Sequence, residues 1–200
     1  MADATAPRFP RLPPEVPQFR SRWRRAVGVA GLRLAGWRIE GPFPALRKSV
    51  LVVAPHTSNW DFVYGFLAYL ALGIEASWLA KHTALSGPLG RIGRRFGGIP
   101  VDRSRAGHMV ESCTAEFARR EGMVLVIAPE GTRKKVAAWK RGYHRIASAA
   151  GVPVVPVAID FSRRCIAFGP PLQPTADADA DERALQAFFH AGMARHPEQY

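Results

Sequence analysis

The chain alternates short apolar runs with longer stretches of helical periodicity. Four short runs, of which the first and third have no polar alternation, predict buried strands at Ser49–Ala54, Ala76–Ala80, Met123–Ala128 and Val152–Ala158. The stretches between and after them predict helices at Trp60–Leu72, Gly87–Phe96, Gly107–Glu121 and Tyr143–Ala150. Strands that alternate with helices predict an α/β fold with a mainly parallel central sheet flanked by helices.

Both ends of the chain extend this plan. Residues 1–18 hold closely spaced prolines, which exclude helix and central strand, so we predict a disordered Pro-rich lead-in there. The remaining residues, 19–200, are expected to form a single domain, because one core suffices for a chain of 200 residues. Cys165–Phe168 predicts an additional edge strand, and Asp181–His196 predicts a terminal helix whose early acidic residues suit its positive end.

A basic amphipathic helix is predicted between Gln18 and Gly36. Arginines occupy many of the positions between its apolar residues, which are Phe19, Trp23, Val27, Ala30 and Leu34. Two interpretations fit this pattern. The helix is either an interfacial anchor whose arginines meet anionic headgroups, or a surface helix that packs on its own domain.

The composition is globular, with a large excess of positive charge. Hydrophobic residues make up 48% of the chain and charged residues 22%, which excludes a mostly disordered, collagen-like or coiled-coil protein. Lys and Arg number 28 against 16 Asp and Glu, so the formal net charge is +12. This balance predicts an anionic partner, which can be nucleic acid, a phospholipid surface or a phosphorylated substrate.

The cysteines and the hydropathy of the chain indicate which kinds of site and membrane contact to expect. Cys113 and Cys165 match no metal-ligand spacing and are too few for a disulfide framework, so both are expected to be reduced and no metal site is predicted. No apolar stretch near the N-terminus resembles a signal-peptide core. The longest uncharged apolar run, Phe62–Ile74, is shorter than the roughly 20 residues of a membrane-spanning helix. Any membrane contact is therefore expected on one face of the bilayer.

A histidine and an aspartate flank the end of the first predicted strand. His56 follows that strand, and Asp61 lies at the start of the next helix, where α/β folds place reacting groups. An aspartate at this spacing can accept from one imidazole nitrogen, which fixes the tautomer and leaves the other nitrogen free as a base. The alternative is a helix-capping aspartate beside an incidental surface histidine.

The turn after the third predicted strand carries a second candidate site. Gly131 permits close backbone approach, and the planar guanidinium of Arg133 matches a phosphate group. Glu130 is expected to pair with an arginine or with a ligand hydroxyl. An ordinary Gly-containing turn is the alternative. Gly97–Arg103 is another turn-rich segment, which either connects two elements or presents Arg103 to the same anion.

Taken together, these segments resemble the glycerolipid acyltransferase family, which includes the 1-acylglycerol-3-phosphate acyltransferases. Four family motifs occur in their usual order between residues 50 and 160. They are the His-x4-Asp motif at His56 and Asp61, the Gly-rich turn Gly98–Arg103, Pro-Glu-Gly-Thr-Arg at Pro129–Arg133, and the strand motif Val152–Val157.

The resemblance implies a role for each motif residue. His56 would be the general base for an acceptor hydroxyl that attacks a fatty acyl thioester directly, and Asp61 would orient it. The residues that would hold the acceptor, chiefly its phosphate, are Arg103, Glu130, Gly131, Thr132 and Arg133. Lys81 is at a place where the family often has lysine, so it is either an oxyanion donor or a solvated surface charge.

The implied activity is that of an O-acyltransferase of phospholipid biosynthesis, at the cytoplasmic face of the cell membrane as a peripheral or monotopic protein. The donor would be acyl-CoA or acyl carrier protein, no other cofactor is implied, and the acceptor would be a lysophospholipid such as 1-acylglycerol 3-phosphate. Pro55 and Ala128 replace the Asn and Phe that the family often has, which predicts a differently shaped acceptor pocket. The stretch His56–Phe62 with Trp139–Tyr143 resembles a bacterial branch of the family, so another acceptor, such as a lyso-aminolipid, stays open.

Several alternatives remain beside this reading. A nucleic-acid-binding protein would fit the charge, but no recognisable module of that kind is present, so no nucleic-acid partner is expected. An inactive lipid-binding relative is a further alternative. Trp60–Leu72 is apolar around almost its whole circumference, so it is expected to be a core helix or, in part, the lining of an acyl-chain groove. His144 and Arg145 are expected at the surface.

Overall fold

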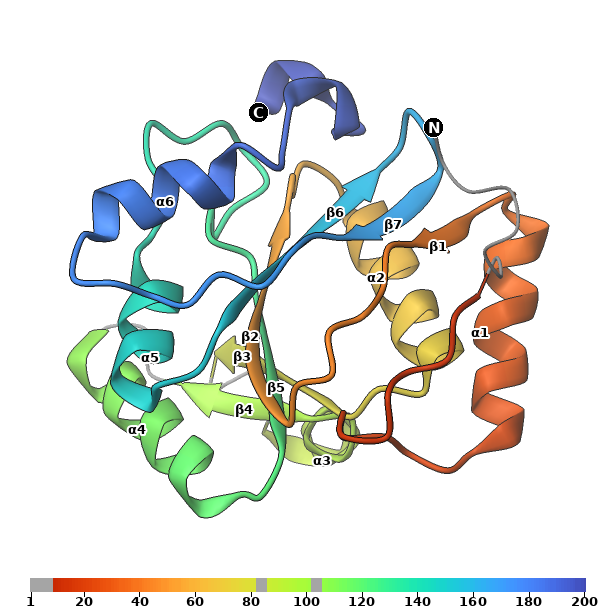
Figure 1. Cartoon of the computed structure of the whole chain (residues 1–200). Helices are drawn as coiled ribbons and strands as arrows, with labels where there is room; N and C mark the ends of the chain where they lie inside the picture. The colour runs from red at the N-terminus through yellow and green to blue at the C-terminus, as the bar shows by residue number, and fades with distance from the viewer. Residues whose placement is uncertain (1–8, 82–85, 102–105) are drawn as a thin grey trace.

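The computed structural model describes residues 9–81, 86–101 and 106–200. Within these ranges, seven strands form one sheet in the order β1-β7-β6-β2-β5-β3-β4 (Figure 1). The strands are β1 Arg38–Glu40, β2 Lys48–Ala54, β3 Ala76–Lys81, β4 Gly98–Val101, β5 Met123–Ile127, β6 Val154–Asp160 and β7 Cys165–Phe168. Only the pair β6 and β7 is antiparallel among these neighbours, so the predicted mainly parallel α/β fold is confirmed.

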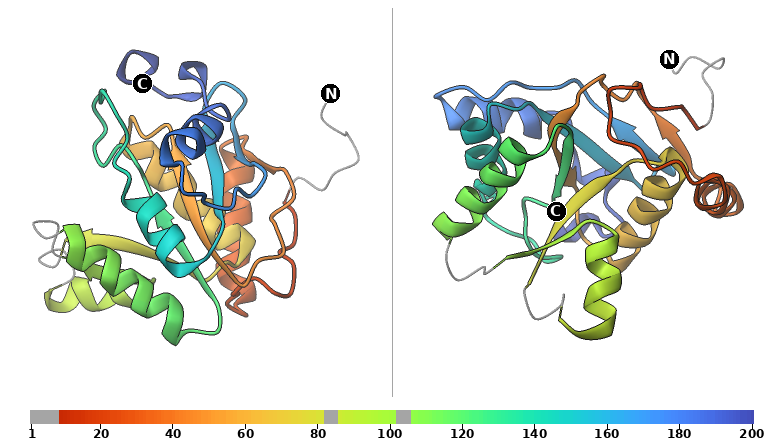
Figure 2. Two further views of the ribbon diagram at one scale, coloured as in Figure 1. Left: turned by 60° about the vertical axis from the view of Figure 1, so that its left-hand side comes forward. Right: turned by 90° about the horizontal axis from the view of Figure 1, so that it is seen from below.

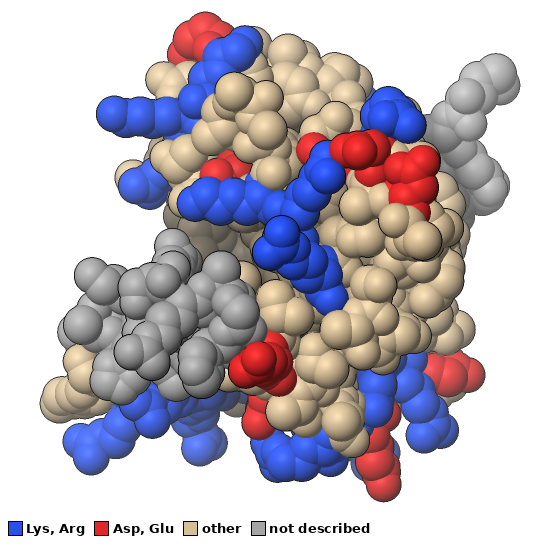
Figure 3. Space-filling model, turned by 90° about the vertical axis from the view of Figure 1, so that its left-hand side faces the viewer, with Lys and Arg blue, Asp and Glu red and all other residues tan. Residues whose placement is uncertain are grey.

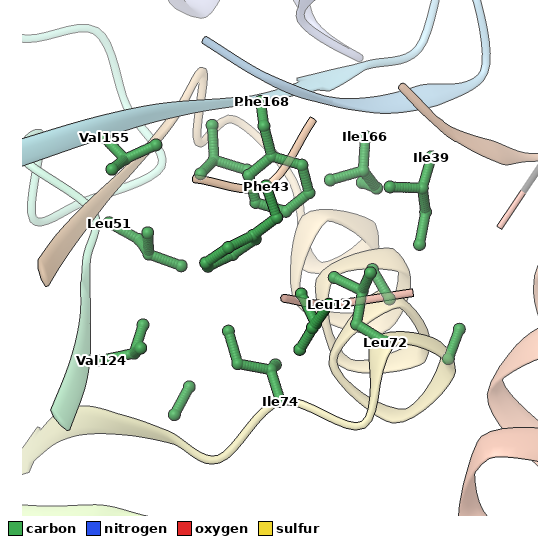
Figure 4. Packing of buried hydrophobic residues seen from close by; sticks show 14 of the residues in the cluster. Leu12, Ile39, Phe43, Leu51, Leu72, Ile74, Val124, Val155, Ile166 and Phe168 are labelled. Carbon is green, nitrogen blue, oxygen red and sulfur yellow. The ribbon is translucent and has the colours of Figure 1, made fainter. Parts of the chain in front are cut away.

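Helices cover both faces of this sheet (Figure 2). They are α1 Arg22–Leu34, α2 Asn59–Leu72, α3 Gly87–Arg95, α4 Ala106–Arg119, α5 Gly142–Ala150 and α6 Ala178–Gln186. Two short 3₁₀ turns, η2 Ala191–Met193 and η3 Pro197–Gln199, follow α6. Alternate residues of β2 divide the core, because Leu51 packs with α1 and α2 on one face, whereas Val50 and Val52 pack with α4, α5 and α6 on the other. Figure 4 shows the Leu51 side of the core.

The candidate site lies at the end of the central strands of the sheet. β2 lies between β5 and β6 and pairs with both in parallel register, Leu51 with Val126 on one side and with Val155 on the other. Since parallel strands end at the same edge of a sheet, the segments that follow β2 and β5 are brought together there. These are the segments that contain His56 and Glu130.

Three elements differ from the sequence-based expectation. β1 and β4 lie in segments for which no strand is predicted, and each is short and ordered by pairing with a neighbouring strand. β7 is not an edge strand, because β1 pairs with its outer side. The terminal helix starts after Asp177, whose side chain accepts from Asp179 N and Ala180 N, and it ends at Gln186. Asp181 therefore lies in the first turn of this helix together with Asp179, as expected for an early acidic residue, and its side chain is buried.

The proline-rich lead-in is packed where the structure describes it. Residues 1–8 lie outside the described residues, but Leu12 and Val16 are buried in the core on the α1 side of the sheet. Gln18 forms an isolated bridge with Ile74. The expectation of disorder is therefore wrong for residues 9–18. Residues 9–18 form no helix and no central strand, as predicted, but the prolines do not prevent the apolar residues between them from packing.

The basic amphipathic helix packs on α2 and also presents apolar residues to solvent. A Cβ at Gly28 would lie 2.3 Å from Ala71 N, so the two helices approach each other closely at this glycine. Leu32 of α1 is fully buried. On the opposite side of the helix, Trp23, Val27 and Leu34 are 70%, 50% and 90% exposed. The helix therefore packs on its own domain without burying its apolar stripe.

Both cysteines are free and buried. Burial raises the pKa of the Cys113 thiol to about 11 and that of Cys165 to about 12, so both are protonated at neutral pH and poor nucleophiles. In the part of the chain that the structure describes, no cluster of His, Cys, Asp and Glu has the arrangement of a metal site. None of the helices described is both long and apolar enough to span a bilayer.

Candidate active site

His56 and Asp61 meet at the start of α2. The Nδ1 atom of His56 lies 3.1 Å from Oδ2 of Asp61, whose side chain is only 1% exposed. The same Oδ2 accepts from the backbone N–H of Ser58 at 2.7 Å, and Ser58 is the N-cap residue of α2. Asp61 thus completes a capping box and also pairs with the histidine. Asp61 therefore caps the helix and contacts the histidine through the same oxygen atom, Oδ2.

The geometry leaves one imidazole nitrogen available. A carboxylate oxygen 3.1 Å from Nδ1 favours the neutral tautomer in which Nδ1 carries the proton, and this tautomer leaves Nε2 unprotonated. The His56 side chain is 27% exposed and lines a cavity. A base held in a fixed tautomer therefore faces a space that a substrate can enter.

Glu130 anchors the backbone at the histidine. Its two carboxylate oxygens accept from the backbone N–H of His56 at 3.2 and 3.0 Å. Burial raises the pKa of Glu130 above its ordinary value, although the hydrogen bond from His56 acts in the opposite direction. Its side chain is buried and does not line the cavity, unlike those of its neighbours. Within the part of the chain that the structure describes, the carboxylate therefore contacts the backbone of His56 and not an arginine, and it joins the loops after β2 and β5.

Arg133 lies on the same side as the histidine. Its guanidinium donates to the side-chain oxygen of Asn59, the first residue of α2, and it lines the cavity together with Gly131 and Thr132. Gly131 has a φ of 65°, which favours glycine, and Nζ of Lys140 would lie 2.9 Å from a Cβ at this position. The turn after β5 is thus held close to both the start of α2 and the segment that leads into α5.

One cavity of about 1240 Å³ connects these groups. A large part of its wall is apolar and comes from α2 and the α2 face of the sheet, including Leu51, Phe66, Ala68, Val157, Ile166 and Phe168. Phe62 of α2 is 64% exposed and also lines it, in a row of stacked rings with Phe66 and Tyr69. The helix is therefore a core helix on one side, as one of the two expectations has it, and a cavity wall on another.

Positive charge dominates the polar part of the cavity wall. Five of the described lining residues are basic, namely Arg133, Lys134, Lys140, Arg141 and Arg145, against the single carboxylate of Asp61. Figure 3 shows the side of the molecule that carries α4, α5 and α6, with Lys and Arg side chains gathered across its centre. An anionic ligand is therefore attracted to the end of the cavity where His56 lies.

Two predicted site residues cannot be placed, and one expectation about the surroundings is wrong. Arg103 lies outside the described residues, and Lys81 ends β3 with its side chain outside them as well.

His144 is buried and not at the surface, because its Nε2 lies 2.8 Å from Oδ2 of Asp181 in α6. Burial raises the pKa of Asp181, but hydrogen bonds from Thr175 and His144 outweigh this and hold it below its ordinary value. Arg145 is exposed, as expected.

The C-terminal segment also borders the site, which sequence reasoning missed. The backbone N–H of His196 donates to Oγ1 of Thr57 at 3.3 Å, and the guanidinium of Arg195 lies over the ring of Trp60 at 5.3 Å. Thr57 precedes the capping box of α2, and Trp60 lies between its two members, Ser58 and Asp61. No local pattern in residues 190–200 indicates these contacts, because they depend on where the chain returns after α6.

Comparisons with known proteins identify the family and a similar fold. A family model described as acyltransferase matches residues 37–160, which is more than half of the chain. The fold is similar to the crystal structure of the 1-acyl-sn-glycerophosphate (LPA) acyltransferase PlsC from Thermotoga maritima, with a TM-score of 0.54 and 18% identity. The likeness covers 85% of this chain and 82% of that one. A search of curated proteins found no match.

Proposed function

This chain belongs to the acyltransferase family, and we propose that it transfers a fatty acyl group from a thioester donor to the hydroxyl of a lysophospholipid. The donor is acyl-CoA or acyl carrier protein that carries the acyl group. The first acceptor to consider is 1-acylglycerol 3-phosphate, because it is the substrate class in the name of the structurally similar enzyme. The observation that carries the proposal is one cavity wall that holds a histidine base, a phosphate-matching arginine and a long apolar lining.

In the proposed reaction, Nε2 of His56 takes the proton of the acceptor hydroxyl while the oxygen attacks the thioester carbonyl carbon. The tetrahedral intermediate then collapses, the carbon–sulfur bond breaks, and the thiolate takes the proton back from the imidazolium. Asp61 holds the ring in the required tautomer and stabilises its positive charge, as its 3.1 Å contact with Nδ1 allows. Glu130 holds the backbone of His56 in place. Lys81 remains the proposed donor to the oxyanion.

The acceptor phosphate is assigned to the turn after β5. Arg133 offers a planar pair of donors close to α2, and Gly131 and Thr132 line the cavity beside it. Arg103 is proposed as a further phosphate ligand. The apolar part of the cavity, beneath Phe66 and beside Phe168, is assigned to an acyl chain, since an extended hydrocarbon is stabilised by leaving water.

The activity and its acceptor are testable in one assay. Purified protein is incubated with labelled acyl-CoA and single lysolipids, and the products are separated by mass. The proposal predicts acylation of 1-acylglycerol 3-phosphate. Arg133→Ala is expected to raise the KM of this acceptor about tenfold with a smaller change in kcat, because it removes binding present in both the ground state and the transition state.

The control is an acceptor without a phosphomonoester, such as a lyso-aminolipid. If Arg133→Ala raises the KM of both acceptors equally, the arginine does not bind the phosphate. Preferential acylation of the lyso-aminolipid would replace the proposed acceptor while leaving the reaction class intact, whereas no product with any lysolipid would indicate a lipid-binding relative without activity.

We also propose that α1 attaches the enzyme to the cytoplasmic face of the cell membrane. Trp23, Val27 and Leu34 form an exposed apolar stripe at helical spacing, with arginines beside it. An apolar stripe of this kind enters the acyl boundary of a bilayer, and arginines bind anionic headgroups.

The double substitution Trp23→Ser with Leu34→Ser is expected to weaken binding to vesicles of phosphatidylglycerol and phosphatidylethanolamine about tenfold or more, since it removes two large apolar groups. Sedimentation of the vesicles measures the bound fraction. The melting temperature should change little because both side chains are exposed. Unaltered vesicle binding by a folded double variant would assign the attachment to another surface.

A further inference from the structure

The cavity has a second, cationic part that the proposed roles leave unused. Its wall also includes Met109 and Val110 of α4, Gly142 and Arg145 of α5, and Lys134 of the turn after β5. α4 and α5 approach each other there, since the end of the Met109 side chain would lie 3.1 Å from a Cβ at Gly142. This part lies on the other face of the sheet from the apolar wall beneath α2, because α4 and α5 pack with Val50 and Val52. Both parts reach the end of β5, at Ile127 and Ala128, which line the cavity as well.

Three of the basic residues that line the cavity lack a carboxylate partner within the described residues. Arg141 forms ion pairs with Asp179 and Glu182 of α6, which compensate its charge. By contrast, no carboxylate of the described ranges pairs with Lys134, Lys140 or Arg145. Uncompensated cations that line one cavity are expected where a ligand supplies the negative charge.

A buried hydroxyl at the same place points to a ligand independently of these charges. Tyr143, in the first turn of α5, is 2% exposed and lines the cavity, yet its hydroxyl has no hydrogen-bond partner among the described residues. A buried hydroxyl without a partner is unfavourable, because it has lost its hydrogen bonds to water and gained none in the protein. The first turn of α5 also presents free backbone N–H groups, and its N-cap residue, Arg141, makes no side-chain cap.

We infer that the part of the cavity between α4 and α5 binds the phosphate of the pantetheine arm of the acyl donor. This assignment rests on the proposed acyl transfer. Lys134 and Arg145 pair with the phosphate, the first turn of α5 donates to it, and the thioester then reaches His56 from the side opposite to the acyl pocket. Arg133, on the α2 side, stays with the acceptor, so each of the two anionic substrates has its own cations.

The phosphate is common to coenzyme A and to phosphopantetheine on a carrier protein. The experiment therefore measures binding of coenzyme A and of holo acyl carrier protein separately by calorimetry, without acceptor, and then the KM of each acylated donor. The double variant Lys134→Glu with Arg145→Glu is expected to weaken donor binding at least about tenfold, while the acceptor KM changes less than about twofold. Both side chains are exposed, so folding is not affected.

Lys135 provides the matched control, because it is an exposed lysine next to Lys134 that does not line the cavity. Lys135→Glu should leave donor binding within about twofold of the unmodified protein. An equal loss with Lys135→Glu would reveal a general charge effect, and a loss confined to the acceptor would assign this part of the cavity to the acceptor. Either result overturns the inference. If the double variant weakens the binding of coenzyme A alone, or of the carrier protein alone, the result identifies the donor and supports the inference.

Tyr143→Phe adds a test that does not depend on charge. Because the hydroxyl has no partner among the described residues, its removal should leave the melting temperature unchanged or slightly higher, while donor binding weakens about threefold or more. A lower melting temperature with unchanged donor binding would show that the hydroxyl has a structural role and would count against the site.

The two proposals fail in different ways. Coenzyme A or holo acyl carrier protein that binds between α4 and α5 without any acyl transfer would refute the proposed function and leave the binding site intact. Acyl transfer with donor constants that do not respond to Lys134→Glu and Arg145→Glu would refute the binding site and leave the proposed function intact.

Discussion

Replacement of His56 by alanine is expected to lower kcat for acyl transfer about 10³-fold to 10⁴-fold, with little change in either KM. The methyl group cannot accept the proton of the acceptor hydroxyl, and an alcohol is a poor nucleophile unless a base removes that proton as the bond forms. The binding groups for the acceptor and the acyl chain are untouched, since they belong to the turn after β5 and to the apolar cavity wall. Steady-state kinetics with labelled donor measures the effect.

The control for this variant is His190→Ala, which removes an exposed histidine from the segment that precedes η2. It should keep near-normal kcat. Circular dichroism should show both variants folded, because the His56 ring is partly exposed and the backbone hydrogen bond to Glu130 does not involve it. A His56→Ala protein that turns over at a near-normal rate would remove the base from the proposed mechanism.

The sequence predicted which loops meet at the candidate site, because the ends of the strands are visible in it. The apolar runs of β2 and β5 are short and end at polar segments, and in a parallel sheet such ends share one edge. His56 and Gly131 are therefore placed near one another by fold class alone. What the sequence did not reveal was how Glu130 takes part, because a carboxylate beside an arginine suggests an ion pair, whereas this one is buried against the backbone of His56.

The errors arose where long-range contacts override local pattern. His144 and Asp181 are 37 residues apart, and neither has a neighbour along the chain that marks it as buried. β1 has only three residues and depends on β7 for its hydrogen bonds. Leu12 and Val16 lie among prolines, so their neighbours predict disorder, yet both fill the core. In each case a partner that is distant along the chain supplies the ordering.

Replacement of Asp61 by asparagine is the second large effect expected, with a loss of about 10³-fold in kcat. If the amide oxygen takes the place of Oδ2, it still accepts from Ser58 N and His56 Nδ1, but the charge that stabilises the imidazolium is lost. The amide nitrogen then occupies the buried position of Oδ1, which has no partner among the described residues. If the amide is reversed, its nitrogen faces Nδ1 and favours the tautomer in which Nε2 carries the proton.

Asp61 also caps α2, so a matched variant is needed to distinguish the loss of the helix cap from the loss of the contact with the base, His56. Ser58→Ala removes the hydroxyl that accepts from Trp60 N at 3.2 Å but keeps the backbone N–H that contacts Asp61. It is expected to cost about 1 kcal/mol of unfolding free energy and to leave kcat within about threefold. Asp61→Asn should cost a similar amount of stability and far more activity. Equal losses of activity in the two variants would mean that the aspartate serves the helix alone, because only its contact with the imidazole distinguishes them.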